Sequence, residues 1–184
     1  VRGHSNVQGD RTMGITTNAP PAFLKALGRE FRFTPPTEPG LDVVQSIRAM
    51  RDGRGKVFIA LGGNFLSATP DVKVVAEGLR RCRLTVQVST KLNRSHLVTG
   101  QQALILPCLG RSEKDGDQFV TVENSMSIVH ASHGKLEPIS LTVRSEPAIV
   151  AGMAKAVLTE DDTPWAEFAG DYTLIRKRIE KTIA

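Results

Sequence analysis

Apolar residues recur at helical spacing between residues 41 and 53. Successive apolar residues are about three positions apart, which places them on one face of a helix. A glycine comes after the last of them, and glycine commonly ends a helix. The pattern predicts a helix that ends near Gly53, with an apolar face made of Leu41, Val44, Ile47 and Met50.

Three short, nearly continuous apolar runs follow, and each predicts a strand. Strands of parallel sheets are buried on both faces, so their sequences read as apolar runs rather than as strict alternations. Glycines bound the first run, which favours a strand over a helix. The runs are KVFIALGGN (56–64), LTVQVST (84–90) and QALILPC (102–108).

A helix is expected between the first two strands. Thr69 is the predicted N-cap, Pro70 the first helical residue, and Asp71 an acid in the first turn. The apolar stripe of this helix consists of Val72, Val75 and Leu79. Two strands joined by one helix form a βαβ unit, which predicts a parallel sheet.

The flanking regions are less regular. Prolines punctuate residues 1–39, whose one apolar stretch is AFLKALGREF, so an extended approach segment is expected there. The irregular alternation of apolar and polar residues over 118–132 predicts one or two short strands or an extended loop. Helices are expected from Glu146 onward and over 165–183, the second broken near Gly170. The predicted class is therefore α/β: a three-layer αβα, Rossmann-like, mainly parallel sheet spanning residues 40–184.

Composition narrows the function classes. The 184 residues, 40% of them hydrophobic, suit one domain with a real core. The net charge of +5 fits ordinary solubility or a patch that binds a phosphate-rich cofactor. One Trp, one Tyr and no zinc-finger spacing argue against nucleic acid, and no apolar run reaches the roughly 18 residues of a membrane span. The isolated Cys82 and Cys108 favour reduced thiols, as expected of a cytoplasmic protein.

Candidate binding residues follow the predicted strands. Ligands of open parallel sheets bind beyond the carboxyl ends of the strands. Gly62-Gly63-Asn64 follows the first strand, and a tight strand-to-helix turn is the alternative interpretation. STKLNRSH (89–96) follows the second and carries groups suited to a ribose, a guanine edge or a phosphate, unless it is only a polar loop. His96 alone is more typical of a hydrogen-bonded loop residue than of a catalyst.

The remaining motifs exclude several chemistries. The loop 106–116, LPCLGRSEKDG, contains Glu113, Lys114 and Asp115, which form either a defined loop or a generic charged turn. Neither GxGxxG nor GxxxxGK[ST] is present, so an NAD-dependent dehydrogenase or a Walker-type site receives little support. Cys108 has no nearby His to activate it, and no metal-ligand cluster is recognisable.

The order of these segments resembles the third domain of the bis-molybdopterin-guanine-dinucleotide (bis-MGD) oxidoreductases, in their formate-dehydrogenase-like branch. The family pattern runs RGxxNVQG, MGxNP, VVxD, then DVVLPxxxxxEKDG. The matching segments here are RGHSNVQGDRTMG, ALGGN, the strand ending at VST, LILPCLGRSEKDG, VENSMS and RSEPAIV. The likeness spans essentially the whole chain and implies one internal domain of a larger enzyme, inactive when isolated.

The resemblance implies a cofactor and a reaction. Such enzymes bind two pyranopterin-guanine dinucleotides around one molybdenum or tungsten and transfer two electrons to or from a small substrate such as formate. An iron-sulfur cluster is expected in a missing N-terminal domain, and other domains of the same polypeptide are the expected partners. The metal-ligating residue would lie outside this chain.

The resemblance also assigns residues. Arg2 matches the arginine that orients formate, and its guanidinium fork suits a carboxylate. The cofactor-binding candidates are Gly62, Gly63, Asn64, Val88, Ser89, Lys91, Lys114 and Glu146.

Three departures qualify these matches. Phe65 replaces the proline of GxNP, Ser89 replaces the usual aspartate, and His4 stands where many formate enzymes have glutamine. Lys91 and Asn93 are candidates to replace the missing carboxylate in guanine recognition. The alternative function is a stand-alone Rossmann-like module that binds a nucleotide or another anion without redox activity.

Overall fold

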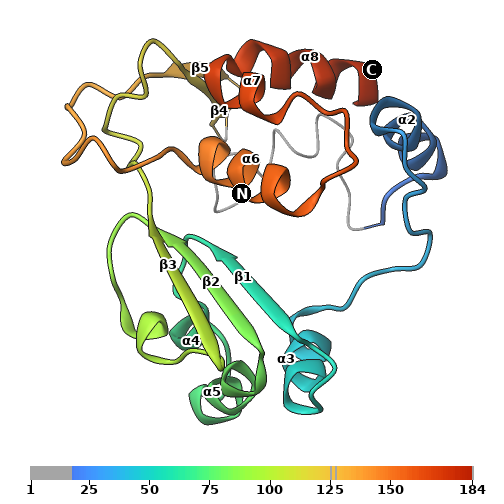
Figure 1. Cartoon of the computed structure of the whole chain (residues 1–184), viewed down its shortest axis with the longest axis vertical. Coiled ribbons are helices and arrows are strands. Elements are labelled where there is room, and N and C mark those ends of the chain that lie inside the picture. Colours follow the sequence, from blue (N-terminus) through green and yellow to red (C-terminus); the bar gives the residue numbers. More distant parts are fainter. Residues whose placement is uncertain (1–17, 125, 127, 184) are drawn as a thin grey trace. The chain divides into compact units, whose positions relative to one another are not determined.

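The computed structural model describes residues 18–124, 126 and 128–183, and it confirms the α/β class (Figure 1). The described residues form two compact units. The sheet unit comprises residues 40–109 and 140–149, and the hairpin unit comprises the described parts of 1–39, 110–139 and 150–184. The predicted division into a segment 1–39 and a domain 40–184 stays a prediction.

A three-stranded parallel sheet flanked by helices, an arrangement of the Rossmann-like α/β type, defines the sheet unit. Its strands are β1 (Val57–Leu61), β2 (Leu84–Ser89) and β3 (Gln102–Pro107), in the order β1-β2-β3. Leu61 lies opposite Val88, and Ser89 lies opposite Pro107. The carboxyl ends of the strands therefore meet at one edge of the sheet, as the three apolar runs predict.

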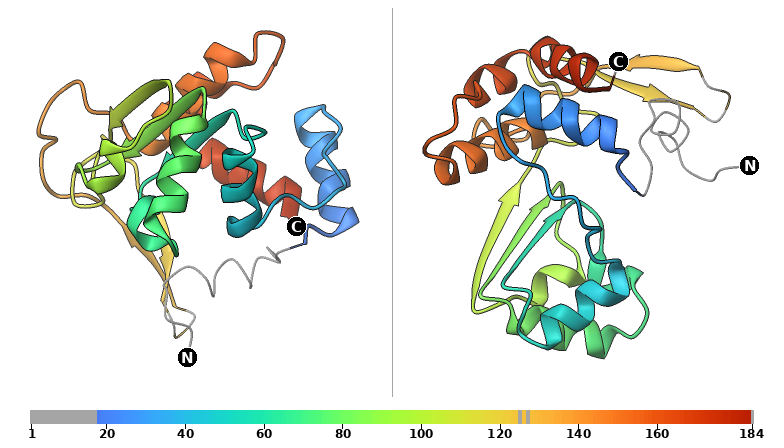
Figure 2. Two further views of the ribbon diagram at one scale, coloured as in Figure 1. Left: turned by 90° about the horizontal axis from the view of Figure 1, so that it is seen from below. Right: turned by 90° about the vertical axis from the view of Figure 1, so that its right-hand side faces the viewer.

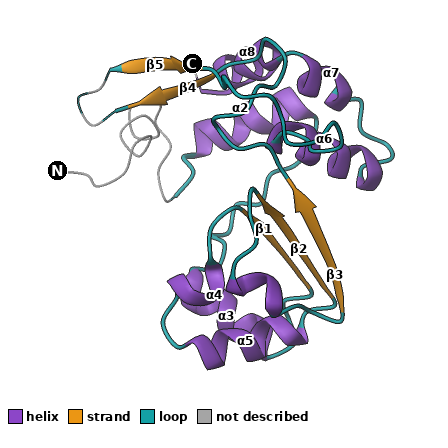
Figure 3. Cartoon of the chain, turned by 90° about the vertical axis from the view of Figure 1, so that its left-hand side faces the viewer, coloured by secondary structure: helices purple, strands orange, loops and turns teal. Residues whose placement is uncertain are grey.

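Helices α3 (Val43–Arg51), α4 (Phe65–Ala68) and α5 (Val72–Arg81) gather on one side of this sheet (Figure 3). A capping box starts α3, because Asp42 accepts the N–H of Gln45 while the Gln45 side chain accepts the N–H of Asp42. Ile47 and Met50 of the first predicted stripe and Val75 and Leu79 of the second lie in the core, as predicted. Leu41, Val44 and Val72 are instead about half exposed, and Leu41 lies before α3. The core consists of Ile47, Met50, Leu66, Val75, Ala76, Leu79, Cys82 and Val98, with Phe58, Phe65 and Val74 packed against it.

The predicted start of α5 is wrong by two residues. Asp71, not Thr69, is the N-cap: it has a φ of 57° and its carboxylate accepts the N–H of Val74 at 3.2 Å. Thr69 instead ends the short helix α4, and its hydroxyl donates to the Phe65 carbonyl at 2.9 Å. The short helix α4 was not predicted from the sequence. Because Thr69 ends α4, it cannot begin α5.

Burial differs between the strands. Thr85 to Val88 of β2 are buried, as expected of a central parallel strand. The prediction is wrong for β1, whose residues Val57, Ile59 and Leu61 are each more than half exposed on the face opposite Phe58. Figure 2 shows the helices between β1 and β2, α4 and α5, on one side of the sheet.

The hairpin unit combines helices with a two-stranded antiparallel sheet. Its strands are β4 (Val120–Glu123) and β5 (Val129–Ser132), which confirms short strands within 118–132. Helix α2 (Pro21–Phe31) packs against α8 (Tyr172–Ile183), so part of the expected extended segment is helical. Helix α7 (Trp165–Gly170) ends at Gly170, where a break is predicted.

Helix α6 (Glu146–Val157) begins at the predicted residue, within the sheet unit, and ends in the hairpin unit. Within the described ranges, every helix is too short or too polar to cross a membrane.

Candidate functional site

The loops after β1 and β2 meet at the carboxyl edge of the sheet. The side-chain amide of Asn93 donates to the Gly63 carbonyl at 2.9 Å. The Ser95 hydroxyl donates to Oδ1 of Asn64 at 2.8 Å. The structure thus brings together the GGN and STKLNRSH segments, as the parallel order of the strands requires.

Ser95 is the centre of this loop network. Its hydroxyl oxygen accepts the N–H of Leu66 at 3.1 Å, and its carbonyl accepts the side-chain amide of Gln87 at 3.1 Å. Ser95 is buried, so these bonds are made away from water. Buried polar groups that are fully paired rigidify their surroundings. The network therefore fixes the position of both loops before any ligand arrives.

Two consecutive glycines shape the first loop. Gly62 and Gly63 have φ values of 71° and 75°, a conformation that residues with a side chain rarely adopt. A Cβ atom added at either position would meet no atom within 4 Å, so the turn faces open space. The Gly62 N–H donates to the Val88 carbonyl at 2.8 Å, whereas the N–H groups of Gly63 and Asn64 donate to no described residue. The turn therefore presents backbone donors at an accessible position.

His96 lies beneath these loops in the 3₁₀ helix η1 (Arg94–Leu97). The Asn93 N–H donates to Nδ1 of His96 at 3.0 Å, which makes His96 the hydrogen-bonded loop residue that the sequence suggests. The residue is buried, with 8% of its surface exposed. Its Nε2 atom is also buried and has no hydrogen-bond partner in the described part of the chain.

A small recess of about 10 Å³ opens between the two loops. This volume holds about one water molecule. Apolar side chains, glycine backbone and polar side chains together line it. The lining residues are Phe58, Ala60, Gly62, Gly63, Phe65, Leu79, Gln87, Val88, Ser89, Ser95 and His96.

The other predicted residues of the sheet unit also lie at this edge. Val88 is buried inside β2, and the hydroxyl of Ser89 donates to the Lys91 carbonyl at 3.0 Å. Lys91 itself is exposed. A parallel bridge joins Cys108 to Arg144 beside the end of β3, so the chain then leads past the carboxyl edge to the exposed Glu146.

Lys114 belongs to the hairpin unit, where it forms an ion pair with Glu137. The neighbouring Glu113 organises the loop, because its carboxylate accepts the N–H groups of Gly110 and Ile139. These bonds, first that from Gly110, lower the pKa of Glu113 below its ordinary value. The segment is therefore a defined loop rather than a generic charged turn. Arg2 lies outside the described residues.

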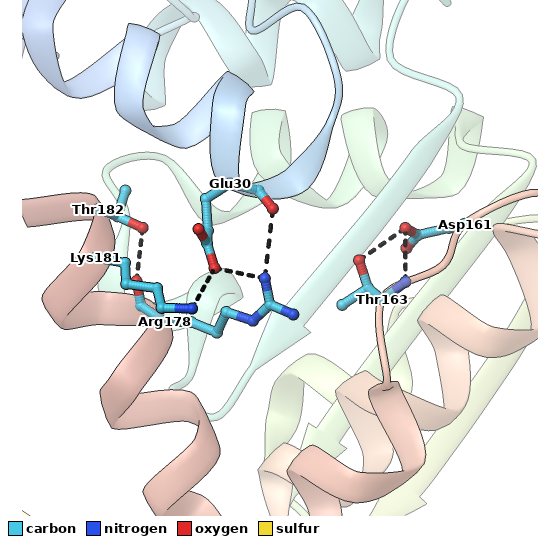
Figure 4. Close-up of polar contacts among 6 residues, drawn as sticks. All are labelled: Glu30, Asp161, Thr163, Arg178, Lys181 and Thr182. Carbon is cyan, nitrogen blue, oxygen red and sulfur yellow. Dashed lines mark hydrogen bonds and ion pairs between the residues drawn. The ribbon is translucent and has the colours of Figure 1, made fainter.

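A second polar cluster, which sequence reasoning missed, lies in the hairpin unit (Figure 4). The carboxylate of Glu30 on α2 pairs with Arg178 and Lys181 on α8. Asp161 accepts hydrogen bonds from Thr163 and from the Trp165 indole, and these lower its pKa. A cavity of about 180 Å³ lies alongside. The Glu30 contacts join helices far apart in sequence, so no local pattern could have indicated them.

Within the described ranges, no group of three or more His, Cys, Asp or Glu residues could hold a metal ion. Cys82 and Cys108 are buried, and neither forms a disulfide bond within the described part of the chain. Burial raises the pKa of the Cys82 thiol, so it is a poor nucleophile.

Comparisons with known proteins place the whole chain within longer relatives. It is 57% identical, over its full length, to 24% of a Mycobacterium bovis protein named uncharacterized oxidoreductase. It is 48% identical, again over its full length, to 25% of protein YdeP of Escherichia coli strain K12. The chain thus spans about a quarter of the length of the curated relatives it matches. No protein-family model matches it.

Proposed function

We propose that this chain is a cofactor-binding domain of a bis-MGD oxidoreductase of the formate-dehydrogenase-like type. The observation that carries the proposal is the meeting of the GGN and STKLNRSH loops at the carboxyl edge of a parallel sheet, where ligands of such folds bind. Relatives named oxidoreductases support the redox class.

The residues at this edge fit a dinucleotide. The positive-φ turn at Gly62 and Gly63 leaves space where side chains would otherwise stand. The unpaired N–H groups of Gly63 and Asn64 suit phosphate oxygens, because backbone donors in such turns form concave anion sites. The exposed Lys91 adds a positive charge nearby.

Each residue then has a defined task. Gly62 and Gly63 admit the nucleotide close to the backbone, and Asn64 binds it with its amide while Ser95 holds Oδ1. Ser89, Lys91 and Glu146 bound the site along the sheet edge, and the last is suited to accept from a sugar or base. Bound in the full-length enzyme, the cofactor supplies a molybdenum or tungsten centre for two-electron transfer.

Formate or a similar small substrate, an iron-sulfur cluster and further domains of the same polypeptide belong to the same proposal. Arg2 would orient the substrate carboxylate, because a guanidinium fork matches two oxygens. Lys114 of the EKDG loop is a further cofactor contact that the resemblance implies. The replacement of the family's aspartate by Ser89 leaves guanine recognition to other groups, for which Lys91 and Asn93 are the candidates.

The test is a cofactor analysis of the full-length protein as isolated. Metal analysis and quantification of GMP released by acid hydrolysis should give two GMP per molybdenum or tungsten atom. The matched variants are Asn64→Ala, at the site, and Asn124→Ala, in the hairpin unit. We expect reduced GMP content only in Asn64→Ala. A folded wild-type protein that contains neither metal nor GMP would refute the proposal.

A further inference from the structure

We propose that the Nε2–H group of His96 donates a hydrogen bond to a phosphate oxygen of the bound nucleotide. One polar atom in the hydrogen-bond network of the two loops lacks a partner among the described residues. Ser95, Asn93, Gln87 and Asn64 are all hydrogen-bonded, whereas the buried Nε2 of His96 lacks a partner within the described residues. Buried polar atoms in native proteins nearly always have a partner, which implies that a group outside the described residues supplies it.

The contacts of the ring favour one tautomer. A backbone N–H can only donate, so the bond from Asn93 N–H makes Nδ1 of His96 the acceptor. Nδ1 of His96 also lies 3.1 Å from the Asn93 carbonyl oxygen, but a proton on Nδ1 would face the Asn93 N–H, so the acceptor role of Nδ1 suits its surroundings better. A neutral imidazole with Nδ1 as acceptor carries its proton on Nε2. The missing partner must therefore be an acceptor.

The position of the ring indicates a ligand. His96 forms part of the wall of the recess between the two loops, together with Gly62, Gly63 and Ser89. The recess has room for one atom the size of a water oxygen, so a single phosphate oxygen fits and a base does not. The ligand's remaining atoms would lie above the glycine turn, beside the N–H groups of Gly63 and Asn64, which donate to no described residue.

Charge favours an anion over a neutral acceptor. The two loops contain Lys91 and Arg94, and the sequence has no Asp or Glu from residue 53 to 70 or from 78 to 112. Carboxylates that would repel a phosphate are therefore absent from both loops. This inference rests on the proposed function only for the identity of the nucleotide, because the recess selects phosphate by its own chemistry.

The experiment is titration calorimetry of the cofactor-free full-length protein with inorganic pyrophosphate and, separately, with guanosine. His96→Phe removes the donor, and His130→Phe on β5 is the matched control. We expect pyrophosphate affinity to fall about 5- to 100-fold in His96→Phe, since a hydrogen bond to a charged group is lost. It should be unchanged in His130→Phe, and guanosine affinity should be unchanged in both.

Unchanged pyrophosphate affinity in folded His96→Phe would overturn the inference, and so would selective loss of guanosine binding. If that variant fails to fold, a crystal structure of the wild-type protein with pyrophosphate decides. A phosphate oxygen within hydrogen-bond distance of Nε2 supports the inference, and a water there instead overturns it. Absence of metal and GMP from the protein as isolated would refute the proposed function alone, leaving this result intact.

Discussion

The hydroxyl of Ser95 donates to the side-chain oxygen of Asn64 while it accepts the backbone N–H of Leu66. One buried side chain thus holds both the proposed ligand-binding amide and the first turn of α4. The geometry of the first loop depends on a residue of the second, some thirty positions later in the chain.

Ser95→Ala should destabilise the protein by about 1–3 kcal/mol, because the buried N–H of Leu66 loses its acceptor. Ser67→Ala is the control: Ser67 is exposed on α4 and its hydroxyl makes no hydrogen bond to a described residue. Urea unfolding of the two variants measures the difference. Equal midpoints would show that the Ser95 contacts contribute nothing to stability.

Gly63→Ala should cost about 1–2 kcal/mol, since alanine is strained at a φ of 75° although no neighbour would clash with it. Gly152→Ala provides a contrast of opposite sign. Gly152 lies inside α6 with open space around it, so alanine should stabilise that helix by about 0.5–1 kcal/mol. Thermal unfolding would separate the two, and a stabilised Gly63→Ala variant would contradict the assigned turn.

Leu79→Ala should lose about 2–5 kcal/mol, because this side chain is almost fully buried between α5 and the sheet. Leu97→Ala makes the same chemical change where the residue is 83% exposed, and it should change stability by less than about 0.5 kcal/mol. Chemical denaturation of both variants tests whether the core is assigned correctly. Similar losses at the two positions would be inconsistent with this packing.

The sheet was predictable because apolar runs such as that of β2 are typical of parallel strands. The start of α5 was not predictable from the sequence. Thr69 belongs to the end of α4 because its hydroxyl donates to the Phe65 carbonyl. The exposure of Ile59 was missed for a different reason. An apolar run indicates that a strand is suited to burial on both faces. It does not indicate which segment, if any, covers each face.

The location of the candidate site followed from topology, because the carboxyl ends of parallel strands share one edge. Its internal organisation did not. Sequence reasoning treated His96 as a loop residue and gave Ser95 no role, since their importance arises from hydrogen bonds between separate loops. A serine and a histidine in a polar stretch carry no local signal that one will be buried and central.

Glu113 should make the stability of the EKDG loop depend on pH. Its pKa is lowered in the folded state by N–H donors of Gly110 and then Ile139. The stabilisation is therefore present above the ordinary glutamate pKa of about 4.3 and is lost as pH falls through the lowered value. Glu113→Gln should unfold at lower temperature than wild type at pH 7, with the gap closing toward pH 3.

The control for this pH series is Glu137→Gln. Glu137 pairs with Lys114 on the surface, where ion pairs contribute little. Melting temperatures across the pH range should therefore follow the wild type closely. A constant gap between Glu113→Gln and wild type from pH 7 to pH 3 would argue against a lowered pKa.

The open face of the sheet gives the last prediction. Ile59 is 55% exposed there, whereas its neighbour Phe58 points to the opposite face and packs against Phe65, with ring centroids 4.8 Å apart and ring planes tilted by 45°. Ile59→Lys should therefore fold normally, while Phe58→Lys should unfold the sheet unit by burying a charge.

Parallel sheets are normally covered on both faces, so residues 1–184 expressed alone should bind a hydrophobic dye such as ANS. Ile59→Lys should reduce that dye binding with little change in circular dichroism. If Ile59→Lys unfolds the chain as Phe58→Lys does, the face that carries Ile59 is a buried core face and its exposure is wrongly assigned.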